Sequence, residues 1–163
     1  MPFSDVTDRL NEDSLVLDML RRSRIDLRTI SKLENMMVRD LLIVMYTTYQ
    51  EHVVEVVLKK VKRHSDNHEA IVNFVRRKIE ETNIDTFALK KLLKQLLPSY
   101  ASNFEFALKD RETTSAYMNI ITGRIDVAHH QGNNLQIGSL VEIAEAHVHA
   151  QRLLQSFESC MYA

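Results

Sequence analysis

The sequence contains little glycine, proline or cysteine. Only three glycines and two prolines occur in 163 residues. An all-β or a doubly wound α/β fold needs many more of these turn signals. The single cysteine, Cys160, excludes a disulfide framework and a cysteine metal site, and it favours a reducing, cytosolic setting. These absences leave an all-α domain as the predicted fold class.

The sequence also lacks an excess of one charge and a long apolar run. Its formal net charge is −1, which gives no electrostatic sign of a duplex-DNA or membrane partner. The longest apolar stretch, residues 41–45, is too short to cross a bilayer. Asp5 and Asp8 interrupt any signal-peptide pattern. We expect a soluble, cytoplasmic protein, for which a short stretch of RNA remains a possible local partner.

The dominant positive signal is a period of 3.6 residues in the apolar side chains. Steps of three and four residues predict one long amphipathic helix from about Asp26 to His64. With 45% hydrophobic residues the chain can bury a substantial core, so this helix is expected to be the centre of an up-and-down helical bundle. No linker or repeat divides residues 1–163, which are interpreted as one domain with residues 1–25 as an N-terminal helical extension.

Two capping boxes predict helix starts. Asp66 with Glu69 three residues later predicts a helix that includes Phe74 and Ile79, and Ser139 with Glu142 predicts the last helix. Between them, a helix is expected from residue 85 or 86 to residue 97, where Pro98 stops it. Another is expected near residues 103–109, and a further one from Thr114 towards Gly123. Residues 124–130 then form a segment between the last two long helices.

The histidines outside that segment are expected to be structural. His52 lies on the apolar stripe of the long helix and is interpreted as a satisfied, partly buried core residue. A helix break separates His64 from His68, which argues against a shared metal ion. His147 is expected to face the core and His149 the solvent. No metal and no cofactor is predicted.

Residues 124–130 combine several polar groups in a short stretch. Arg124 carries a permanent charge that can bind phosphate oxygens, and His129 can transfer protons near neutral pH. On a continuous helix these two residues point about 140° apart, so a bend, a helix end or a dimer must bring them together. Asp126 is placed to orient His129 or His130. From spacing alone, an ordinary surface salt bridge between Arg124 and Asp126 remains an alternative.

In this segment the chain resembles the HEPN superfamily of helical bundles. The family pattern Arg-Asn-x-x-Ala-His-Gly aligns with Arg124-Ile125-Asp126-Val127-Ala128-His129-His130, matching at Arg, Ala and His. The run Asp-Leu-Leu-Ile-Val-Met-Tyr-Thr-Thr-Tyr-Gln-Glu over residues 40–51 is similar to the apolar helix with an aromatic-acidic pair in HEPN domains of the RiboL-PSP type. The resemblance extends from about Asp26 to the C-terminus.

The resemblance implies a metal-independent endoribonuclease of a toxin–antitoxin or phage-defence system. It implies Arg124 and His129 as catalytic residues, with Asp126 and His130 in support. It also implies a homodimer whose two motifs face one cleft, with RNA as the substrate.

The chain departs from the family pattern at Ile125 and His130, where the family has Asn and Gly. These departures favour an alternative, a catalytically inactive helical module that binds a protein partner such as a nucleotidyltransferase antitoxin. A third hypothesis, a metal-binding bundle, lacks the repeated Glu-x-x-His pattern of di-iron proteins.

Overall fold

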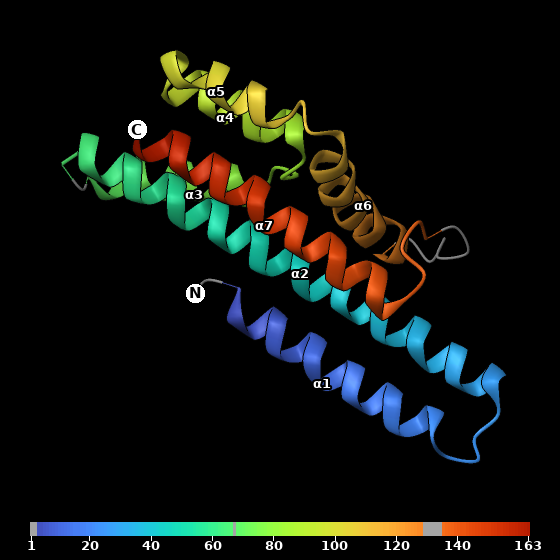
Figure 1. Cartoon of the computed structure of the whole chain (residues 1–163). Helices are drawn as coiled ribbons and strands as arrows, with labels where there is room; N and C mark the ends of the chain where they lie inside the picture. Colours follow the sequence, from blue (N-terminus) through green and yellow to red (C-terminus); the bar gives the residue numbers. More distant parts are fainter. Residues whose placement is uncertain (1–2, 67, 129–134) are drawn as a thin grey trace.

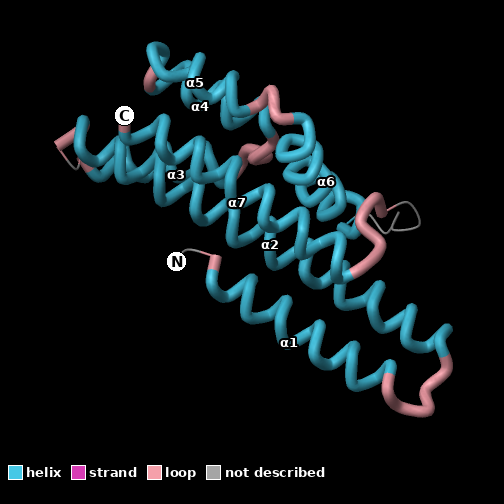
Figure 2. The backbone as a smooth tube through the Cα atoms, in the orientation of Figure 1, coloured by secondary structure: helices cyan, strands magenta, loops and turns pink. Residues whose placement is uncertain are grey.

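The computed structural model of the chain describes residues 3–66, 68–128 and 135–163, and every regular element in these ranges is a helix. The order along the chain is α1 (Ser4–Arg21), α2 (Leu27–His64), α3 (Glu69–Glu80), α4 (Thr86–Leu96), the 3₁₀ turn η1 (Pro98–Tyr100), α5 (Ala101–Ala107), α6 (Arg111–Ala128) and α7 (Leu140–Tyr162) (Figure 1). The predicted all-α fold class is therefore confirmed. The helices are joined by short connections in the described part of the chain (Figure 2).

Helix α2 is the long helix that the periodicity predicts. It has 38 residues, which corresponds to a length of about 57 Å, and the Asp26 side chain caps it by accepting a hydrogen bond from the Thr29 N–H at 2.9 Å. Helices α1, α3, α6 and α7 all pack against it (Figure 1). The Leu140 N–H donates a hydrogen bond to the Glu34 carboxylate at 3.1 Å, so α7 begins beside Glu34 of α2. The turns of α2 before Glu34 extend past the start of α7 and pack against α1.

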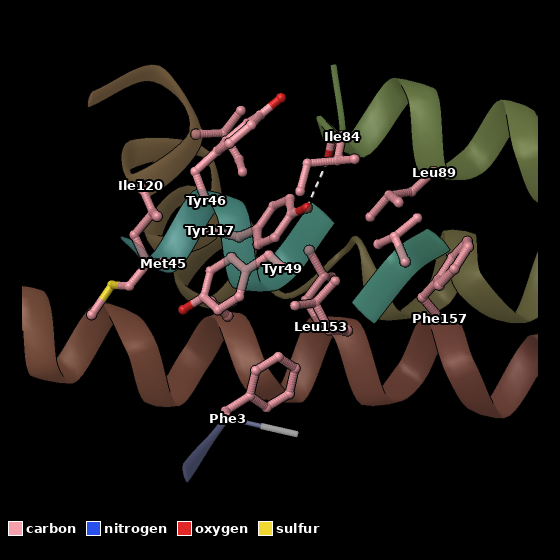
Figure 3. Close-up of a cluster of buried hydrophobic side chains, with 14 of the residues drawn as sticks. Phe3, Met45, Tyr46, Tyr49, Ile84, Leu89, Tyr117, Ile120, Leu153 and Phe157 are labelled. Carbon is pink, nitrogen blue, oxygen red and sulfur yellow. Dashed lines mark hydrogen bonds between the residues drawn. The ribbon is translucent and has the colours of Figure 1, made fainter. Parts of the chain in front are cut away.

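The core lies where α7 packs between α2, α6 and α5. Its largest fully buried side chains are aromatic and come from four helices, namely Tyr49, Tyr117, Phe104 and Phe157. Figure 3 shows Tyr49, Tyr117 and Phe157 of this group. The Tyr117 hydroxyl donates a hydrogen bond to the Ile84 carbonyl at 2.5 Å. A buried phenol needs such a partner, and this bond ties α6 to the turn before α4.

Two of the predicted helix starts are confirmed in their capping chemistry. The Asp85 carboxylate accepts from the Ala88 N–H at 2.8 Å, and α4 follows directly. The Ser139 hydroxyl accepts from the Glu142 N–H at 3.2 Å. The Glu142 carboxylate reaches back to the Gly138 N–H at 2.7 Å, one residue before the position that a capping box predicts.

The capping box at Asp66 is wrong. Helix α3 begins at Glu69, its N-cap is His68, and no side chain caps it. Asp66 has a φ of 48°, in the left-handed region, and the His68 N–H donates to the Ser65 carbonyl at 2.8 Å. Asp66 therefore belongs to the turn that reverses the chain after α2, which an aspartate tolerates better than most residues.

The boundaries around α5 and α6 also differ from the expectation. Helix α5 covers residues 101–107 rather than 103–109, and α6 begins at Arg111 rather than Thr114. The Asp110 carboxylate accepts hydrogen bonds from the N–H groups of Glu112 and Thr113 and from the Thr113 hydroxyl, which starts the helix early and lowers the pKa of Asp110. Helix α6 continues past Gly123 to Ala128, so Arg124 lies on a helix and not in a separate segment.

Among the described residues, no helix combines the length and the apolar character needed to cross a membrane.

Candidate functional site

Gly123 sets the distance between α6 and α2 directly before the predicted catalytic arginine. It is buried, and a Cβ atom at this position would lie 3.1 Å from Leu42 Cδ1 on α2. Such a contact is tighter than ordinary van der Waals packing, so glycine permits a close approach that a larger residue would widen. The backbone of Arg124 is therefore held close to the surface of α2.

Arg124 packs its guanidinium group on an aromatic ring of α2. Its central carbon lies 4.5 Å from the centroid of the Tyr46 ring, a cation–π contact. The Tyr46 hydroxyl donates to Asn83 Oδ1 at 3.3 Å. Figure 3 shows Tyr46 on the same stretch of α2 as Tyr49, with its hydroxyl directed away from α7. The arginine is half-buried, and this contact places its guanidinium group on the face of the Tyr46 ring.

The Arg124–Asp126 salt bridge, which spacing alone left as an alternative, does not form among the described residues. Within the described residues, no carboxylate lies within 4.0 Å of the Arg124 guanidinium, and no hydrogen bond or ion pair involves Asp126. A separation of two residues on a helix corresponds to about 200°, which directs the two side chains apart. Ile125 and Asp126 are both half-buried. The predicted residues His129 and His130 lie outside the described residues.

The contacts of Arg124 with Tyr46 and of Tyr46 with Asn83 were not predicted from the sequence. Tyr46 lies in the 40–51 run that resembles the family pattern, but nothing in a one-dimensional pattern pairs it with an arginine 78 positions later. Chemically, the arrangement provides a delocalised cation on an aromatic surface, without a neutralising carboxylate among the described residues. Such a group can bind an anion such as a phosphodiester.

His147 lies in a buried polar network, in agreement with its predicted core position. Its Nδ1 is hydrogen-bonded to the Tyr49 hydroxyl at 2.6 Å, and its Nε2 is hydrogen-bonded to the Gln151 side chain at 2.7 Å. Phe3 packs edge-on against both the Tyr49 and His147 rings. Burial lowers the pKa of His147 to about 4, so the imidazole is neutral at physiological pH.

The other described histidines do not form a metal site. His52 is buried as predicted, but its Nε2 makes no hydrogen bond and lies 3.4 Å from a Glu158 oxygen; burial lowers its pKa. His149 was expected to be exposed, and this expectation is wrong. Its side chain is 19% exposed, and its Nδ1 is hydrogen-bonded to the Thr113 hydroxyl at 3.1 Å. His64 ends α2 and His68 precedes α3, so they do not share a helix face. Within the described ranges, no three metal-ligating side chains cluster.

Comparison of the chain with protein-family models, with curated proteins and with solved structures finds no match.

Proposed function

We propose that the chain is an endoribonuclease of the HEPN type, and that Arg124 and His129 are its catalytic residues. The observation that carries the proposal is Arg124 itself. It belongs to the family-like motif, it is held on α6 against Tyr46, and it has no carboxylate partner among the described residues. A guanidinium group that no carboxylate neutralises remains available to bind a phosphate group of RNA.

The chemistry is a metal-independent transesterification. His129 removes the proton from a ribose 2′-hydroxyl, and the 2′-oxygen attacks the adjacent phosphorus. The bond from phosphorus to the 5′-oxygen breaks, and the departing oxygen takes up a proton. The products are a 2′,3′-cyclic phosphate and a 5′-hydroxyl. Arg124 binds the phosphate and stabilises the negative charge that develops on it, and Asp126 and His130 support the histidine.

A homodimer belongs to this proposal. Two symmetry-related copies of α6 that face one cleft would place two motifs on one RNA strand, and twofold dimers are the most common soluble assemblies. This arrangement would also bring Arg124 and His129 together even where a continuous helix would direct them about 140° apart. We propose with it a HEPN-type arrangement of the bundle, a cytoplasmic location and a role in a toxin–antitoxin or phage-defence system.

Cleavage of a labelled single-stranded RNA tests the assignment. We expect Arg124→Ala and His129→Ala each to abolish cleavage while the helical circular-dichroism signal is retained. The matched controls are Arg152→Ala and His64→Ala, which remove an exposed arginine of α7 and the exposed last residue of α2. Both controls should cleave like the wild type. Cleavage that persists in the double variant at Arg124 and His129 would refute the proposal.

A second candidate function is a catalytically inactive module that binds a protein partner, such as a nucleotidyltransferase antitoxin. Exposed apolar side chains on α1 and the first turns of α2 favour it: Leu15, Met19, Leu27 and Met36 are each more than 60% exposed. Large apolar side chains gathered at a surface mark interaction sites. Expression in a bacterial host discriminates between the two functions, because an active nuclease should slow growth and an inactive module should not.

A further inference from the structure

A groove between α3 and α4 exposes two aromatic rings. Phe74 of α3 is 62% exposed and Phe87 of α4 is 75% exposed, and both line the same groove, which has a volume of about 520 Å³. Exposure of a phenylalanine to this extent costs hydrophobic free energy, and apolar side chains gathered at one groove mark an interaction site. The floor of the groove is apolar and includes Val57 of α2.

The charged side chains that line this groove favour an anionic ligand. Lys78 and Lys91 lie on its two helices. Lys91 is exposed and has no ion pair among the described residues, whereas Lys78 pairs at 3.3 Å with the exposed Glu81. The carboxylate in the lining is Asp85, which already accepts the Ala88 N–H as the cap of α4. Aromatic rings with interspersed cations are typical of sites that bind single-stranded nucleic acid, where bases stack and phosphates meet lysines.

The lining of the groove is connected to Arg124 through Asn83 and Tyr46. Asn83 lines the groove, and its side-chain oxygen accepts the hydrogen bond from the Tyr46 hydroxyl. Tyr46 in turn carries the guanidinium of Arg124 on its ring. Two contacts, from Asn83 to Tyr46 and from Tyr46 to Arg124, therefore link the lining of the groove to Arg124. The eleven residues of α4 correspond to about 16 Å of helix, which provides space for more than one base along the wall.

We propose that the α3–α4 groove binds single-stranded RNA, with bases stacked on Phe74 and Phe87 and phosphates at Lys78 and Lys91, and directs the strand to Arg124. The proposal rests on the proposed ribonuclease function, since it assigns the binding surface for the substrate of the same site. It also specifies the substrate class: a duplex, whose bases are already stacked on one another, does not offer its faces to these rings.

The absence of tryptophan from the chain allows a direct test. Phe87→Trp introduces a single indole into the lining of the groove, and Phe106→Trp, a ring 74% exposed on α5, provides the matched control. Both are made in the His129→Ala background so that the RNA stays intact. We expect a single-stranded oligoribonucleotide to quench the Phe87→Trp emission through stacking and to leave the Phe106→Trp emission unchanged. The matched duplex should quench neither.

Affinity measured by anisotropy of labelled RNA gives a second readout. Phe74→Leu and Phe87→Leu keep an apolar side chain but remove the stacking ring, and each should weaken binding by about tenfold, while Phe106→Leu should not. Lys78→Gln with Lys91→Gln should reduce the slope of log affinity against log salt concentration by about 1.4, since each phosphate contact with a single strand contributes about 0.7. Circular dichroism checks that each variant is folded.

Several results would overturn the proposal. The first is unchanged Phe87→Trp emission at RNA concentrations that saturate the anisotropy signal. The second is equal quenching by polyglutamate, and the third is equal quenching by anionic phospholipid vesicles. The fourth is an emission change that depends on protein concentration in the absence of RNA. The last three would identify an acidic protein, a membrane or a second copy as the occupant. RNA cleavage by the wild type, together with no RNA effect on the Phe87→Trp emission, would refute RNA binding in the groove and leave the ribonuclease proposal intact. Quenching by single-stranded RNA in the His129→Ala background, together with no cleavage by the wild-type chain, would support the groove and refute the ribonuclease proposal.

Discussion

Lowering the pH should destabilise the fold through His147. The residue is 3% exposed, and both of its ring nitrogens already have partners, Tyr49 and Gln151. Burial lowers its pKa from 6.5 to about 4 in the folded state. Because the folded pKa lies below the unfolded one, the unfolded chain takes up a proton first. The stability that the neutral histidine provides is therefore complete above pH 6.5 and is lost as the pH falls towards 4.

The size of the effect follows from these two pKa values. Between pH 7 and pH 5 the unfolded state gains about 2 kcal/mol from protonation of this residue, and the full difference reaches about 3 kcal/mol near pH 4. His52, whose pKa is also lowered by burial, acts in the same direction, although Glu158 and Glu55 oppose its shift. A loss of 2 kcal/mol is a large part of the stability of an ordinary domain. Most of this loss of stability occurs between pH 7 and pH 5, where carboxylates remain ionised.

Urea unfolding followed by circular dichroism at pH 7 and pH 5 measures this loss. In His147→Gln the side chain no longer titrates, so the difference between the two pH values should fall by about 2 kcal/mol even if the variant is less stable at pH 7. His64→Gln, at the exposed end of α2, is the control and should behave like the wild type. The reasoning is refuted if His147→Gln and the wild type lose the same free energy between pH 7 and pH 5.

Two further substitutions test individual contacts. Tyr117→Phe removes the donor to the buried Ile84 carbonyl and should cost about 1–3 kcal/mol in urea unfolding, and a loss below 0.5 kcal/mol would show that this carbonyl finds another partner. Tyr46→Leu removes the ring under Arg124, worth about 0.5–2 kcal/mol at such a contact, and should slow RNA cleavage, whereas Tyr46→Phe keeps the ring and most of the activity. Equal rates for the Leu and Phe variants would contradict a positioning role for the ring.

Most of the helical framework could be predicted from the sequence because it depends on local chemistry. The period of α2 and the caps at Asp26, Asp85 and Ser139 involve residues three or four positions apart. The error at Asp66 has the same origin. Its pattern satisfies a capping box, but the turn after α2 places its backbone in a left-handed conformation, which depends on how α3 packs back on α2.

The candidate site could be predicted only in part. Arg124 is recognisable from its motif, but its partner Tyr46 comes from another helix, and the packing of α6 on α2, which is close at Gly123, brings the two side chains together. The α3–α4 groove was missed for a similar reason. The sequence placed Phe74 in the apolar pattern of its helix, which suggests burial. In the structure, α2 covers only part of the apolar side of α3, and Phe74 stays exposed in the groove.

The uninterrupted course of α2 has a consequence for how this chain can vary in length. Inserting or deleting one residue in a helix rotates everything beyond it by about 100° and shifts it by about 1.5 Å. In α2 that rotation would separate Tyr46 from Arg124, or Val57 from the floor of the groove, depending on which side of Tyr46 it occurred. We therefore expect α2 to tolerate single-residue insertions much less often than it tolerates substitutions, and we expect tolerated insertions only in the turns.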